Sequence, residues 1–173
     1  MDGVFQRGES SKLEEATAVG ITRGGEQVIA EAPPGNASQI DSGPAYQTLK
    51  NMGADFLYGM HLHPASIKYE SKSGDFRVSV PESSSGDRDS KIGTIQPKID
   101  LGYDIAGNTS KLTASDLSAA KSKPDTYQPL NASKFPKMMT FYRNSGNIAT
   151  SLNYIDFKNA VQKINAATAI PRR

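Results

Sequence analysis

The first half of the chain alternates short apolar runs with breaks rich in glycine and proline, a pattern typical of strands and helices joined by tight turns. Arg23-Gly24-Gly25-Glu26 lies between two such runs, and its adjacent glycines favour a hairpin turn. Pro44 stands in the first turn of a segment that Gly53 ends, which predicts a helix. The predicted elements are strands over 16–22 and 27–32, a helix over 45–52 and a mostly buried strand over 54–63.

The second half regains this pattern after a long polar stretch. Phe157, Val161 and Ile164 recur at helical spacing and predict an amphipathic helix near the end of the chain. The predicted elements of this half are a helix over 113–121, hairpin strands over 137–143 and 148–152, and a helix over 155–167. This order predicts an α/β fold in which a mixed β-sheet is flanked by helices, within a single domain over 13–173.

Two segments carry too few apolar residues to contribute much to a core. Residues 1–12 are predicted to be a disordered lead-in. Residues 66–110 are predicted to be a long insertion, either a functional one or a disordered loop. Within this insertion the sequence predicts a hairpin over 67–70 and 76–80, a mobile serine-rich part over 81–90 and weak strand signals over 92–105.

Composition narrows the chemistry that the chain can perform. There is no cysteine, which excludes disulfides and thiolate zinc sites, so any metal must be bound by His, Asp, Glu or water. The net charge of +2 creates no strong field for nucleic acid or an acidic membrane, and neither is expected as a partner. We find no pattern of a signal peptide and no apolar run long enough to span a bilayer.

The two histidines of the chain, His61 and His63, lie two residues apart at the end of the strand predicted over 54–63. Residues at this spacing on a strand point to the same face, and imidazole is a common zinc ligand. Two exposed or hydrogen-bonded histidines are the alternative interpretation. The pattern favours a metal site over that alternative, but such a site needs a third protein ligand.

Asp116 is the leading candidate for the third ligand because it lies at a predicted helix start, in Thr113-Ala114-Ser115-Asp116. The same residues also fit a capping box, in which Thr113 and Asp116 hydrogen-bond each other's backbone. The two interpretations are compatible. Weaker candidates, for calcium, are Asp87, Asp89, Asp100 and Asp104, whose spacing fits no known calcium loop and for which a solvated insertion is the favoured explanation.

His-x-His-Pro at 61–64, followed by Thr-x-x-Asp at 113–116 and preceded by a glutamate before the first strand, resembles the JAMM (MPN-plus, JAB) metallopeptidase family. The resemblance implies a cytidine-deaminase-like layer architecture, with Zn²⁺ bound by His61, His63 and Asp116. It implies that Glu15 is the general base and that Thr113, where the family has Ser, stabilises the oxyanion. Glu14 is the alternative base, and we expect it to face solvent. The gap between Pro64 and Thr113 is longer than in the family.

The resemblance implies a zinc-dependent peptidase or isopeptidase that hydrolyses an amide bond in a protein or peptide. In its compact size, the chain resembles the C-terminal effector domains of bacterial polymorphic toxins of the rearrangement-hot-spot (Rhs) type. That likeness implies a secreted or delivered effector acting in a target cell, with an immunity protein as a candidate partner. The alternatives are a catalytically inactive protein-binding module on the same fold and a metal-dependent nuclease toxin.

Overall fold

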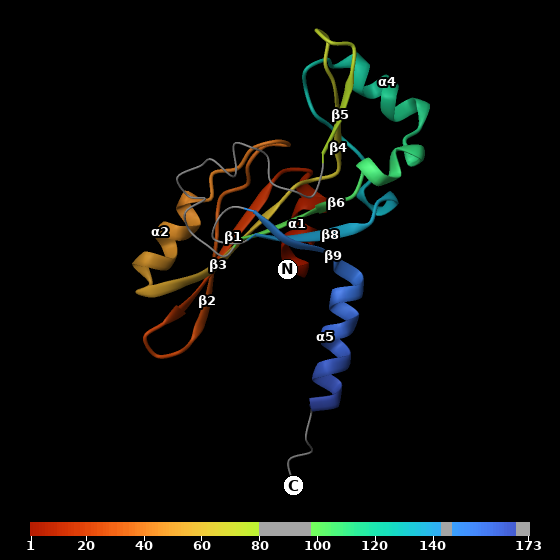
Figure 1. Cartoon of the computed structure of the whole chain (residues 1–173). Coiled ribbons are helices and arrows are strands. Elements are labelled where there is room, and N and C mark those ends of the chain that lie inside the picture. The colour runs from red at the N-terminus through yellow and green to blue at the C-terminus, as the bar shows by residue number, and fades with distance from the viewer. Residues whose placement is uncertain (80–97, 143–146, 169–173) are drawn as a thin grey trace.

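The computed structural model describes residues 1–79, 98–142 and 147–168, and it confirms the mixed α/β fold. Its centre is a six-stranded sheet in the order β2-β1-β3-β6-β8-β9 (Figure 1). Neighbouring strands are antiparallel except β3 and β6, which are parallel. The strands are β1 (Glu15–Thr22), β2 (Gln27–Glu31), β3 (Ala54–Leu62), β6 (Lys98–Tyr103), β8 (Lys137–Tyr142) and β9 (Ile148–Asn153).

The strands and helices predicted outside the polar segments are all present in the structure. The Gly24-Gly25 turn joins β1 to β2, and Gly25 adopts the positive φ that such turns require. Pro44 lies in the first turn of its helix, as the sequence predicts. The helices at these positions are α2 (Gly43–Asn51), α4 (Ala114–Ser122) and α5 (Tyr154–Thr168). None of the helices described is long and apolar enough to cross a membrane.

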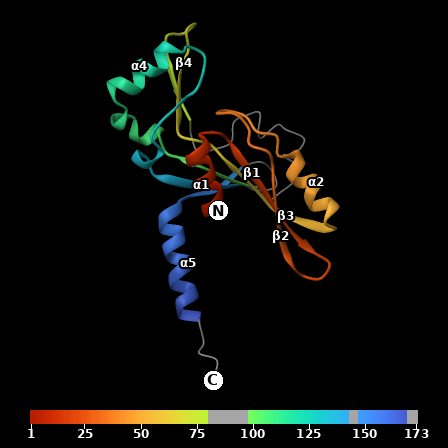
Figure 2. The same ribbon diagram turned by 180° about the vertical axis from the view of Figure 1, so that it is seen from behind.

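The predicted disordered lead-in is instead a helix, α1 (Asp2–Ser11). Val4 and Phe5 are buried in the main core, and Gly8 lets the helix backbone approach the side chain of Leu62. Figure 2 shows α1 lying on one face of the sheet. Two carboxylates fasten this helix: Asp2 accepts hydrogen bonds from Tyr154 and Lys158, and Glu9 accepts them from Tyr103 and Lys137. Tertiary contacts therefore order a segment whose local sequence is a poor helix former.

The range predicted as an insertion, 66–110, contains both a satellite and a central strand. The predicted hairpin is present as β4 (Ser66–Tyr69) and β5 (Phe76–Val78), which form a small sheet with β7 (Gln128–Pro129). Helix α4 packs on β4, at one end of the molecule (Figure 1). The serine-rich part, 81–90, lies outside the described residues. The last part of the range, β6, differs most from the prediction because it lies at the centre of the main sheet.

The two faces of the main sheet are covered by different helices. Val19 on β1 and Met60 and Leu62 on β3 share a core with α1, whereas Ala16 and Ala18 share a smaller core with α2. We call these the α1 face and the α2 face. Helix α2 lies over β1, β2 and β3. Helix α5 contacts β8 and β9 and then extends away from the sheet, leaving Ile164 largely exposed (Figure 1).

Candidate metal centre

The site begins with the strand that carries both histidines. His61 lies in β3, opposite Ala16 of β1 on one side and Asp100 of β6 on the other. His63 follows the end of β3, and its backbone N–H donates a 2.7 Å hydrogen bond to the carbonyl of Leu101. The extended backbone thus continues through His63, so the two imidazoles lie on the same side of the chain, as the sequence predicts.

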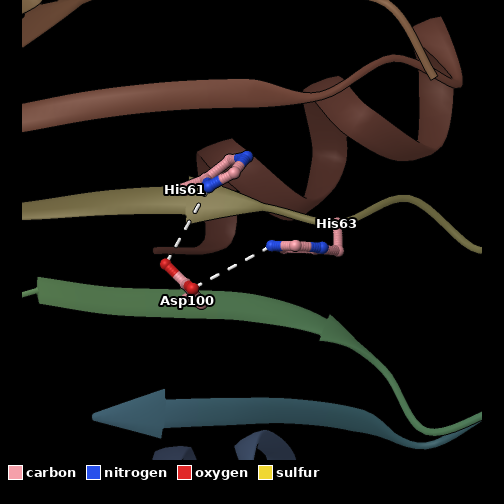
Figure 3. A group of neighbouring side chains, drawn as sticks. All are labelled: His61, His63 and Asp100. Atoms are coloured by element: carbon pink, nitrogen blue, oxygen red, sulfur yellow. Dashed lines mark ion pairs between the residues drawn. The ribbon is translucent and has the colours of Figure 1, made fainter. Parts of the chain in front are cut away.

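Asp100 completes the group from the parallel neighbour strand. Its carboxylate lies between the two imidazoles, with Oδ1 3.9 Å from Nδ1 of His61 and Oδ2 3.9 Å from Nε2 of His63 (Figure 3). The imidazole ring centroids are 4.6 Å apart. Asp100 is fully buried and both histidines are nearly so. Each of the three residues offers one ligand atom, and these atoms lie within 4.8 Å of one another.

This donor set fits a metal ion. Two imidazole nitrogens and one carboxylate oxygen are ligands that zinc and other divalent transition metals accept, and three protein ligands leave a position for water. His61, His63 and Asp100 could therefore hold a metal ion, and within residues 1–79, 98–142 and 147–168 they are the group of donors that meets this description.

The structure does not bring Asp116 to the histidines, in contrast to the sequence prediction. Asp116 forms a complete capping box at the start of α4, where its Oδ2 accepts a 2.8 Å hydrogen bond from the backbone N–H of Thr113. That hydrogen bond is the main cause that lowers the pKa of Asp116, and Lys134 lies 3.5 Å from the same oxygen. Thr113 is committed to the same box, so neither residue lies in the His-His-Asp group.

The positions of the two candidate glutamates are the reverse of those expected from the sequence. Glu15 lies opposite Leu62 on the α1 face, where Ser11 and Arg7 donate hydrogen bonds to its carboxylate. Glu14 is buried rather than solvent-facing, and its Oε2 lies 2.7 Å from Nε2 of His61. The physical reason is strand alternation: Ala16 shares the face of His61, so Glu14 shares it too and Glu15 cannot.

Glu14 is well placed to orient His61. With Nε2 of His61 donating to Glu14, the lone pair of Nδ1 faces Asp100 and is available to a metal. Carboxylate–imidazole pairs of this kind fix the tautomer and raise the basicity of a metal-binding histidine. The site therefore comprises three candidate ligands and one orienting carboxylate.

Further polar side chains continue the site across the α2 face. Lys98 lies two residues before Asp100 on β6, with its ammonium 3.8 Å from Oδ1 of Asp100. Tyr46 of α2 also lies on this face. Burial, and to a smaller extent the negative charge of Asp100, raises the pKa of Tyr46 to about 12. Thr140 of β8 lies opposite Asp100 and is fully buried, hydrogen-bonded to Ser151 of β9.

Sequence reasoning considered Asp100 only as a weak calcium ligand and expected Glu14 to face solvent, whereas the structure places Asp100 between the histidines and Glu14 against His61. The alternation in Ile99-Asp100-Leu101-Gly102-Tyr103 indicates a strand with one apolar face, and it places Asp100 on the opposite face without showing what covers it. Comparisons of the chain with protein-family models, with curated proteins and with solved structures gave no match. The description of this centre consequently depends on the chain's own residues.

Proposed function

We propose that the protein is a zinc-dependent hydrolase that cleaves an amide bond in a protein or peptide. The observation that supports this most directly is the buried group of His61, His63 and Asp100, with Glu14 against His61. A bound zinc ion would polarise the scissile carbonyl and lower the pKa of an attacking water. Zinc is favoured over calcium or magnesium because two of the three donors are imidazole nitrogens.

In this proposal Glu14 has two functions. Its contact with Nε2 of His61 holds the imidazole in the tautomer that directs Nδ1 toward the ligand group. If its carboxylate moved from His61 toward a metal-bound water, Glu14 would also accept the proton of that water and return it to the leaving amine. Glu15, which is hydrogen-bonded to Ser11 and Arg7 on the other face, takes no part.

The likeness to JAMM metallopeptidases now depends on fewer residues. His61, His63 and Pro64 keep the histidine motif, and Glu14 supplies a preceding glutamate. The aspartate comes from β6 instead of the Thr113–Asp116 segment. The activity of an Rhs-type toxin effector delivered to a target cell, and its pairing with an immunity protein, stay predictions.

Metal analysis tests the proposal directly. The purified protein, reconstituted with zinc and desalted, should retain one equivalent by mass spectrometry of the metal. His61→Ala and Asp100→Asn should lose it, while circular dichroism shows that both variants remain folded. Asp116→Ala is the matched control and should retain zinc, because its carboxylate caps α4. Wild-type protein without stoichiometric zinc would contradict the proposal.

Activity is tested on the zinc-loaded protein with a fluorogenic peptide library. We expect hydrolysis that Glu14→Gln abolishes without loss of zinc, because glutamine still accepts a hydrogen bond from His61 but is not a base. A plasmid-nicking assay run in parallel addresses the nuclease alternative. Zinc binding without peptide cleavage would contradict the peptidase hypothesis and favour a binding module with a structural metal. The full burial of Asp100 supports this alternative.

A further inference from the structure

Two side chains beside the candidate metal centre have no role in holding a metal, yet both could donate hydrogen bonds to a ligand. Lys98 lies in β6, and Tyr46 lies in α2. They come from elements that are distant in sequence and approach the same part of the α2 face. Thr113, which the family resemblance predicts to stabilise an oxyanion, belongs to the capping box of α4. The site thus needs another donor for that purpose.

The sheet register places Lys98 beside the centre. Lys98 lies opposite Gly59, as Asp100 lies opposite His61, so the two pairs occupy neighbouring positions of β3 and β6. Lys98 shares the face of Asp100 because it lies two residues away along the strand. Its side chain is only 18 % exposed, and its ammonium lies 5.9 Å from the ring centroid of Tyr142. A lysine charge is therefore held next to the histidines and away from most of the solvent.

Gly59 provides the space for Tyr46. A Cβ at Gly59 would lie 2.6 Å from the Tyr46 hydroxyl, so the hydroxyl rests directly on the glycine backbone. The ring of Tyr46 is fixed by an edge contact with Phe56, at a centroid separation of 5.2 Å. In the described part of the chain, no hydrogen-bond partner of this hydroxyl is found. The hydroxyl can donate a hydrogen bond, and it lies against Gly59, two residues before His61 on β3.

Charge balance indicates what these donors would bind. The ammonium of Lys98 lies 3.8 Å from Oδ1 of Asp100 and neutralises part of its charge. A divalent ion held by Asp100 would compete with Lys98 for that carboxylate, so the ammonium of Lys98 could pair with a second anionic group beside the ion. An ammonium and a neutral hydroxyl beside a divalent ion attract an anionic oxygen, and such charge-assisted hydrogen bonds are strong in a buried site.

We propose that Lys98 and Tyr46 form an anion-binding pocket next to the metal centre, which takes a carboxylate, a phosphate or the oxyanion that develops during amide hydrolysis. The inference rests on the proposed metal centre, because the ion is what releases Lys98 from Asp100. It assigns the stabilisation of the oxyanion to the α2 face instead of Thr113.

Inorganic phosphate is the probe, because its tetrahedral oxygens resemble a tetrahedral oxyanion. Calorimetric titration of the zinc-loaded wild-type protein should show one phosphate site. Lys98→Met should raise the phosphate Kd at least about tenfold, since a hydrogen bond from a charged donor is lost. Lys98→Arg should restore most of the affinity. Tyr46→Phe should raise the Kd about threefold to tenfold, and Gly59→Ala should have a similar effect by displacing the hydroxyl.

Each variant has a matched control elsewhere in the chain. Lys68 of β4 is likewise partly buried, paired with a carboxylate, Glu70, and near a tyrosine ring, so Lys68→Met should leave the phosphate Kd unchanged. Tyr58 of β3 packs against the core of the α1 face, so Tyr58→Phe should also have no effect. Zinc content is measured for every variant before phosphate is added.

The outcomes separate this inference from the proposed function. A zinc-loaded protein that binds no phosphate, or binds it equally well as Lys98→Met and Lys68→Met, overturns the anion pocket and leaves the metal centre intact. A wild-type protein that retains no zinc overturns both. Phosphate binding that depends on Lys98 and Tyr46, in a protein that cleaves no peptide, supports the pocket and removes the peptidase.

Discussion

One set of aligned positions across the centre of the sheet buries Leu62, Leu101 and Met139, and the next set buries His61, Asp100 and Thr140. The first set faces α1 and belongs to the main hydrophobic core. The second set points to the opposite face and is polar throughout. The same three strands thus supply an apolar core on one face and the candidate metal ligands on the other, because successive residues of a strand alternate between faces.

This contrast shows where folding free energy is used. Burial of large apolar side chains stabilises the fold, whereas burial of ionisable side chains costs free energy that their hydrogen bonds and ion pairs must offset. Sites of this kind are more often functional than structural. The α2 face is therefore where substitutions should change binding and turnover, and the α1 face is where they should change stability.

The adjacent glutamates test this division most sharply. Glu14→Gln should lower kcat/KM for peptide hydrolysis by about 10² to 10⁴, the usual contribution of a general base, with zinc retained. Glu15→Gln removes a carboxylate that Arg7 and Ser11 contact on the α1 face and should leave kcat/KM within about twofold of wild type. Steady-state kinetics on both variants would contradict the division if Glu15→Gln were the inactive one.

Leu101 and Thr140 compare the two faces by stability. Leu101→Ala should lower the free energy of unfolding by about 2–5 kcal/mol, because it leaves a cavity in the main core. Thr140→Val removes a hydroxyl that is hydrogen-bonded to Ser151, and should lower it by about 1 kcal/mol. Urea denaturation of the metal-free proteins measures both. Equal losses would mean that the polar face contributes as much to stability as the apolar one.

Asp116 tests whether α4 belongs to the site or only to the scaffold. Asp116→Asn should lower the free energy of unfolding by about 1 kcal/mol at pH 7, as loss of a cap does, and leave zinc content unchanged. Because hydrogen bonding lowers the pKa of Asp116 in the folded protein, its contribution is present above the carboxyl's ordinary pKa and is lost as the pH falls through the folded value. Melting temperatures of the two proteins should therefore converge in acid.

Asp2 gives the smallest expected effect. Hydrogen bonds from Lys158 and Tyr154 lower its pKa, so the stabilisation of α1 is present at neutral pH and is lost as the pH falls through the folded pKa. The pair is largely exposed, and Asp2→Asn should cost less than about 1 kcal/mol at pH 7. Hydrogen exchange of the α1 amides measures the change. Unchanged exchange would mean that Val4 and Phe5 alone hold the helix.

The local elements could be predicted from the sequence because their signals are local. The Gly24-Gly25 turn and the Pro44 helix start depend on residues next to each other in the chain. His61 and His63 could be paired for the same reason, since strand alternation alone gives them a common side. The choice of Glu14 over Glu15 depends instead on the pairing of Ala16 with His61, which is a distant contact.

The place of Asp100 beside the histidines and the order of α1 could not be predicted because they depend on distant contacts. The aspartate becomes a ligand candidate only when β6 pairs in parallel with β3, and no local pattern specifies that partner. Asp116 looked more convincing because the signal of a capping box resembles part of a metal motif. Helix α1 contains Gly3 and Gly8 and few apolar residues, so its order comes from Phe5 in the core and from its hydrogen bonds to distant side chains.

The parallel pairing of β3 with β6 has a consequence for folding kinetics. His61 and Asp100 are about 40 residues apart in the chain, so the ligand group forms only after a long loop has closed. A divalent ion bound there would act as a removable cross-link that bridges the two strands and is absent from the unfolded chain. Chelation should then accelerate unfolding as well as end catalysis, and metal supply would set the lifetime of the folded protein.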